Sequence, residues 1–158
     1  MPKSAMMQSS SNPWNFHNLD KALISPNGLH KVVYYDLNEI AMGAPLGGKC
    51  FLEIEENQKF KINDWCAGPP VWDVSGRYLA IPMWMKVAFR GTVQKMGVVD
   101  LNTMELIIFS KIFKVLYLRS FDGKIIKAIN SPVYKPAHVI FNIENEKTDR
   151  VVKLVALQ

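Results

Sequence analysis

The feature that most constrains this chain is a glycine-closed turn that occurs three times. The turns contain Gly28, Gly76 and Gly123, which are separated by 48 and 47 residues, and a run rich in β-branched and aromatic residues follows each one. Such turns favour positive φ at or beside the glycine, a conformation that other residue types adopt reluctantly. A repeat at this spacing predicts that the fold is built from three similar units.

Each unit continues with the same order of elements, namely a strand, a polar turn and a further strand. We expect the units at residues 19–64, 65–111 and 112–158. Val, Ile, Tyr, Phe and Trp dominate the runs, as is typical of strands. Nine prolines interrupt the chain too often for long helices, although residues 18–24 could form one helical turn or an edge strand. Each unit has a second strand followed, after a polar turn, by a third. These two strands are KCFLEI and KFKI in the first unit, MGVVDL and LIIF in the second, and HVIFNI and RVVKLV in the third. The sequence therefore predicts an all-β protein.

Two of the turns carry a family resemblance. ISPNG (24–28) and WDVSG (72–76) resemble the W-S-P-D-G turn of WD40-like, TolB-type β-propeller repeats, and GVVDLNT (97–103) is similar to the hairpin of those blades. Trp72 holds the aromatic position of the second unit, where the other units have Ile24 and Arg119. The resemblance covers most of residues 19–154 and implies blade topology, no catalytic chemistry and a protein-binding scaffold.

Three blades are too few to close a propeller, which takes at least about four. We therefore expect three propeller-blade-like antiparallel units in an open or partial propeller or a β-sandwich. The exposed sheet edges would be covered by the chain itself, by a second copy in a six-bladed ring, or by a partner.

The length of 158 residues suits one domain, which we expect at residues 18–158 after a flexible Ser- and Asn-containing leader at residues 1–17. No apolar run approaches the ~18 residues that span a bilayer, and the start does not resemble a secretory signal. Cys50 and Cys66 are too few for a disulfide framework, so we expect reduced, semi-buried thiols in a cytoplasmic protein. With three scattered histidines and no ligand motif, we expect no metal and no cofactor.

Catalytic patterns are weak throughout the sequence. GAPLGGK (43–49) has the glycines and lysine of a phosphate loop but lacks the following Ser or Thr and the helix, so a loop between strands is expected. Ser131 has no obvious base, and a pair of Cys50 or Cys66 with a histidine stays open because catalytic partners meet in space. Asp73 is expected to cap its own turn rather than to form an acid–base pair with Asp64.

The net charge of +5 comes entirely from residues 86–127, which hold eight basic and three acidic residues. Such a zone could attract an acidic protein, an anionic membrane or nucleic acid. Alternatively, its charged side chains could simply be the solvent-facing positions of ordinary strands. Because no recognition helix or aromatic RNA-binding motif accompanies it, we expect neither nucleic acid nor membrane as a partner.

A cluster of aromatic, methionine and basic residues provides the candidate contact surface. In the run at residues 81–89 both alternating faces are apolar before Lys86, which indicates either a strand buried on two sides or a face presented to a partner. Trp, Met and Arg are enriched where proteins bind one another. The predicted partner-binding residues are Trp65, Trp84, Met85, Lys86, Phe89, Arg90, Lys95 and Arg119.

These features predict a small protein-binding module without catalysis. The narrowest expectation is an immunity protein of bacterial competition, a toxin inhibitor that occludes a cognate toxin with an acidic surface. The alternatives are a β-rich enzyme that uses Cys66 or Ser131, and a scaffold subunit that self-associates as a homodimer through its sheet edges.

Overall fold

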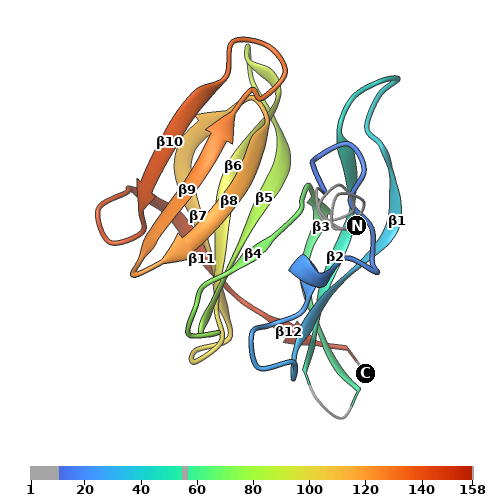
Figure 1. Ribbon diagram of the computed structural model, residues 1–158, viewed down its shortest axis with the longest axis vertical. Helices are drawn as coiled ribbons and strands as arrows, with labels where there is room; N and C mark the ends of the chain where they lie inside the picture. Colours follow the sequence, from blue (N-terminus) through green and yellow to red (C-terminus); the bar gives the residue numbers. More distant parts are fainter. Residues whose placement is uncertain (1–10, 55–56, 158) are drawn as a thin grey trace, which may run out of the picture.

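The computed structural model describes residues 11–54 and 57–157 and is all-β with antiparallel sheets, as predicted (Figure 1). Within these residues no helix has the length and apolar character needed to span a bilayer. The elements are the 3₁₀ helix η1 (Lys21–Leu23) and the strands β1 (Lys31–Glu39), β2 (Leu46–Ile54), β3 (Gln58–Cys66), β4 (Val71–Trp72), β5 (Tyr78–Val87), β6 (Gly91–Asp100), β7 (Glu105–Phe113), β8 (Leu116–Asp122), β9 (Ile125–Asn130), β10 (Ala137–Asn142), β11 (Thr148–Lys153) and β12 (Val155–Ala156).

The strands form two hydrogen-bonded sheets. The larger has the order β1-β2-β3-β5-β6-β7-β11, with β4 also pairing with β5 and β12 with β3, and the smaller has the order β10-β9-β8. β3 and β5 pair at Cys66 and Met83 and then diverge, so the larger sheet divides into a β1–β3 part and a β5–β7 part (Figure 1). The result is an open stack of three layers.

Two hydrophobic cores lie between the three layers. Residues of β5 alternate between them: Leu79 and Ile81 belong to the core shared with β1–β3, whereas Tyr78 and Ala80 belong to the core shared with β8–β10. The two apolar faces of residues 81–89 therefore mark a strand buried on both sides over most of its length. The sequence of the second unit, which has the strongest strand pattern, predicts that this unit forms the stability core. The five residues expected to be buried there are all buried, namely Trp72, Tyr78, Leu79, Ile81 and Val99.

The three glycine turns have the predicted conformation. Gly28, Gly76 and Gly123 have φ of +76°, +81° and +58° and precede β1, β5 and β9, respectively. In the second turn the Asp73 Oδ1 atom accepts a hydrogen bond of 2.7 Å from the backbone N–H of Tyr78. This bond confirms that Asp73 caps its own turn.

The predicted hairpin at the end of the third unit is wrong. Its two strands are present, but β10 pairs with β9 in the smaller sheet, whereas β11 pairs with β7 in the larger one. β12 then joins β3 in the first layer. The physical gain is that β11 pairs with the backbone edge of β7, which would otherwise be an open edge of the larger sheet.

The prediction of a flexible leader is wrong for residues 11–17, and its residues 1–10 lie outside the described residues. Phe16 is buried with its ring centroid 5.0 Å from that of Tyr34, and the backbone N–H of Leu46 donates to the Pro13 carbonyl at 3.0 Å. An aromatic side chain in the first core outweighs the polar composition of the segment.

Candidate partner-binding end

Three connections between strands lie at the same end of the stack, at the top of Figure 1. They are residues 40–45 between β1 and β2, residues 88–90 between β5 and β6, and residues 131–136 between β9 and β10. Each comes from a different layer. Together with the short β7–β8 connection at residues 114–115, we call them the loop end.

Hydrogen bonds between layers hold the loop end together. The indole N–H of Trp84, on β5, donates to the Leu46 carbonyl at 3.0 Å, at the start of β2. In the other direction, the Gln94 side-chain oxygen, on β6, accepts from the backbone N–H of Leu116 at 2.6 Å, at the start of β8. These two bonds tie the middle layer to the start of β2 and to the start of β8.

Phe89 occupies the tip of the β5–β6 hairpin and is fully exposed. Its φ is +66°, in the left-handed region, and the Arg90 N–H closes the turn on the Val87 carbonyl at 3.0 Å. A bulky side chain at positive φ is an uncommon, strained arrangement that clusters at functional sites. Gly or Asn would suit this turn better, and the aromatic ring that stands here is exposed rather than packed in a core.

Other large apolar side chains are exposed at the same end. Met42 is 99% exposed in the β1–β2 connection, and Val133 and Tyr134 are 77% and 66% exposed in the β9–β10 connection. Single exposed apolar residues are normal, but several at one end of a molecule indicate an interaction site.

The loop end is also basic. Lys86, Arg90, Lys114 and Lys135 are exposed there, and in the described part of the chain none of them lies within ion-pair distance of an acidic group. At the opposite end, Arg77 and Lys124 are each paired with a carboxylate at 3.0 Å. Unpaired cations beside exposed apolar groups favour a partner surface that is acidic around an apolar centre.

The structure separates the residues predicted to bind a partner. Lys86, Phe89 and Arg90 lie together at the hairpin tip, with Met85 half-buried just before them. Trp84 is 5% exposed, with its ring centroid 6.1 Å from that of half-buried Trp65, so the pair supports the loop end from within. Trp84 is therefore not available to contact a partner, contrary to the prediction.

Two further predicted residues lie apart from the tip. Lys95 pairs with Asp149 of β11 at 3.2 Å, on the exposed edge of the middle layer. Arg119 stands over the Tyr117 ring at 4.4 Å on the smaller sheet. Neither position is near the turn that presents Phe89, because Lys95 lies four residues into β6 and Arg119 lies in the middle of β8.

Sequence reasoning missed Met42, Val133, Tyr134 and Lys135. The available signal was local: SPVYKP places two apolar residues and a lysine between prolines, where a chain has no strand to bury them in. Their contribution to a common surface depends on the layers being stacked, which no local pattern reveals.

The thiols proposed as alternative nucleophiles are buried in the first core. Cys50 and Cys66 are free and fully buried. Burial, together with the neighbouring Cys66, raises the pKa of the Cys50 thiol well above its usual value, and burial likewise raises the pKa of Tyr34 beside them. Burial therefore favours the protonated thiol, whereas a nucleophile must be a thiolate.

The other sequence candidates have structural roles. The Ser131 hydroxyl donates to the Tyr134 carbonyl within the β9–β10 connection. In GAPLGGK, a Cβ atom at Gly47 would lie 2.8 Å from Ile40 and 2.9 Å from Trp84, so this glycine permits close packing at the start of β2. No phosphate-binding helix follows it.

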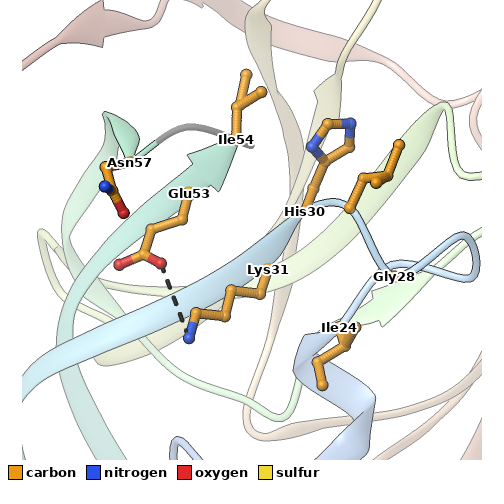
Figure 2. Close-up of a pocket in the computed structure, with 8 residues that line it drawn as sticks. Ile24, Gly28, His30, Lys31, Glu53, Ile54 and Asn57 are labelled. Carbon is orange, nitrogen blue, oxygen red and sulfur yellow. Dashed lines mark ion pairs between the residues drawn. The ribbon is translucent and has the colours of Figure 1, made fainter.

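A pocket of about 260 Å³ lies at the start of β1, away from the loop end (Figure 2). Lys31 and Glu53 form an ion pair of 3.8 Å there, and Ile24, Leu29 and Ile54 supply apolar walls. The buried Nδ1 atom of His30, another lining residue, has no hydrogen-bond partner among the described residues. Among the lining residues that the structure describes, none is a Ser, Thr or Cys.

Within the described residues no three His, Cys, Asp or Glu side chains are grouped as metal ligands would be. Comparison with protein-family models, with curated proteins and with solved structures gave no match. The functional argument therefore depends on the geometry of the loop end.

Proposed function

We propose that this protein is a binding module without catalysis and that it contacts a protein partner through the loop end. The observation that carries the proposal is Phe89, a fully exposed aromatic residue held at positive φ on a hairpin tip. Conformations of this kind cost about 1–3 kcal/mol and cluster at functional sites. Aromatic residues at the centre of an interface are typical binding hot spots.

The charges at the loop end support an acidic partner. Lys86 and Arg90 flank Phe89 in sequence, and no carboxylate of the described residues neutralises them. Such charges mainly increase the association rate, while buried anchors such as an aromatic ring slow dissociation. Binding should therefore weaken with added salt through slower association.

A narrower proposal names the partner as a bacterial toxin and the chain as the immunity protein that occludes it. The three-layer scaffold with an exposed apolar and basic end supports an occluding role, because such a surface can cover an acidic site. A β-rich enzyme that uses Cys66 or Ser131 stays an alternative. The burial of the Cys66 thiol and the local hydrogen bond of the Ser131 hydroxyl argue against it.

The test uses the protein encoded beside this chain as the candidate partner. Titration calorimetry with the full chain should give a complex, and Phe89→Ala should weaken it while melting at the wild-type temperature. Absence of a complex would reject the toxin–immunity pairing. A complex that Phe89→Ala leaves equally tight would reject the loop end as its contact surface.

A further inference from the structure

Gln94 differs from the other buried polar residues of this protein. Among the described residues, the buried polar or charged side chains are those of Ser25, Asp73, Gln94 and Asp100. The oxygen atoms of Ser25, Asp73 and Asp100 are hydrogen-bonded in or beside turns at the end opposite the loop end. Gln94 lies within β6 and is fully buried, and its Nε2 atom has no hydrogen-bond partner among the described residues.

The unpaired amide nitrogen makes Gln94 unfavourable for the stability of the fold. A buried donor without a partner costs more free energy than a typical hydrogen bond contributes. An apolar side chain of the same size would avoid that cost. The contact that such a side chain could not replace is made by the amide oxygen, which accepts from the Leu116 N–H at 2.6 Å.

A second amide oxygen acts on the same stretch of chain. The Oδ1 atom of Asn130, the last residue of β9, accepts from the N–H groups of Lys114 and Val115 at 3.0 and 3.4 Å. Together with the bond from Leu116 to Gln94, three consecutive backbone N–H groups thus donate to side-chain oxygens. The β7–β8 connection passes from the middle layer to the smaller sheet in two residues, and it is held from both layers.

The β9–β10 connection is tied to the same point. The Ser131 N–H donates to the Val115 carbonyl at 2.8 Å, and the Ser131 hydroxyl donates to the Tyr134 carbonyl. Ser131 and Lys135 have φ of +57° and +54°, and such conformations persist only where the surrounding structure holds them. These bonds link the position of the exposed residues Val133 and Tyr134 to that of the β7–β8 connection.

Gln94 also belongs to the hairpin that presents Phe89. In the β5–β6 hairpin it lies opposite Trp84, and on its other side it lies opposite Phe113, the last residue of β7. Phe89 is at the tip of the same hairpin. One buried side chain thus joins the hairpin of Phe89 to the β7–β8 connection and, through it, to the β9–β10 connection.

We propose that Gln94 is a positioning residue of the loop end, which holds the β7–β8 and β9–β10 connections in place relative to Phe89 before a partner binds. This inference rests on the function proposed above, because it concerns the same contact surface. A surface that is already ordered loses less conformational entropy on binding, so this order increases affinity without adding a contact. Without the Gln94 oxygen, the Leu116 N–H loses its acceptor and the spacing between Phe89 and Tyr134 is no longer fixed.

Amide hydrogen exchange, measured by NMR on the free full chain, tests the positioning without a partner. In wild type the N–H groups of Lys114, Val115 and Leu116 should be protected. Gln94→Met should speed exchange at Leu116, and Asn130→Ala should speed it at Lys114 and Val115. Asn130→Asp keeps the acceptor oxygen and should keep their protection. Equal protection of Leu116 in Gln94→Met and in wild type would overturn the proposal.

Titration calorimetry with the protein encoded beside this chain, with melting recorded on the same samples, separates positioning from a purely structural role. Gln94→Met should weaken binding roughly tenfold while melting close to wild type, because it removes an unpaired donor together with one bond. If Gln94→Met fails to fold, Asn130→Ala, at a partly exposed position, should weaken binding in the same way. The matched control is Ser25→Ala, which removes a buried acceptor of the His30 N–H away from the loop end. It should lower the melting temperature without changing affinity.

The two measurements distinguish failure of this inference from failure of the proposed function. A Gln94→Met variant that melts lower but binds as tightly as wild type would behave like Ser25→Ala and would overturn the positioning role. If wild type itself forms no complex, the function proposed above fails. Faster exchange at Leu116 in Gln94→Met would then still support Gln94 as the residue that orders the connections.

Discussion

The indole N–H of Trp84 donates to the Leu46 carbonyl at 3.0 Å and thereby joins the middle layer to the first at the loop end. Trp84 is nearly inaccessible, and a Cβ atom at Gly47 would lie 2.9 Å from its Cδ1 atom. Gly47 of GAPLGGK therefore leaves room for the Trp84 side chain. Trp84 in turn holds the end of the β1–β2 connection through the Leu46 carbonyl.

Trp84→Phe should destabilise the protein by about 1–3 kcal/mol, because the Leu46 carbonyl loses the indole donor in a partly buried setting. Chemical denaturation measures this free energy of unfolding. The matched variant is Trp14→Phe, since the Trp14 indole donates to the Gly43 carbonyl at 3.2 Å from an exposed position. If Trp84→Phe lowered the free energy of unfolding by less than Trp14→Phe, the role assigned to Trp84 would be contradicted.

Gly123→Ala should cost roughly 1–2 kcal/mol, the price of a left-handed conformation for an L-residue. A Cβ atom there meets nothing within 4 Å, so the loss is due to the backbone alone. Gly123→Asn should lose less, because Asn tolerates this region. Equal stability of the alanine variant and wild type in urea would contradict the turn geometry.

Much of the fold follows from local patterns. The three glycine turns, the hairpins of the first two units and the burial of Trp72 and Leu79 were predicted because turn chemistry and strand composition act locally. The exchange of β11 to the middle layer was not, since it depends on which sheet edge needs cover. Similarly, Phe89 and Arg90 were predicted as contacts, whereas Trp84 is buried, because alternation does not tell a strand covered on both faces from one presented to a partner.

Asp100 should make stability depend on pH. Burial raises the pKa of its carboxyl, but hydrogen bonds from the Arg77 guanidinium and from backbone N–H groups outweigh this, so the pKa lies below its usual value. For a lowered pKa, the stabilisation is complete above the unfolded value of ~3.9 and is lost as pH falls through the folded value. The difference in unfolding free energy between wild type and Asp100→Asn should therefore shrink under acid conditions. A difference that stays constant from neutral to acid pH would contradict the pairing.

The Cys50 thiol should resist alkylation in the folded protein. Burial raises its pKa, so little thiolate is present even at mildly alkaline pH. Mass spectrometry after iodoacetamide treatment should show Cys50 and Cys66 unmodified under native conditions and modified in urea. Rapid labelling of Cys50 in the native protein would show that the first core opens to solvent. That result would support the alternative of an enzyme with a cysteine nucleophile.

The central claim is that Phe89 and Arg90 bind a protein partner at the loop end. The most direct measurement is the dissociation constant of the Phe89→Ala/Arg90→Ala variant for the protein encoded beside this chain, with the melting temperature recorded on the same sample. The matched control is Leu19→Ala/Lys21→Ala, which also removes an exposed apolar and a basic side chain, but away from the loop end. We expect the first variant to bind at least ~2 kcal/mol more weakly, roughly 30-fold in Kd, with unchanged melting, and the control to bind as wild type. Equal affinity of the two variants and wild type would contradict the claim.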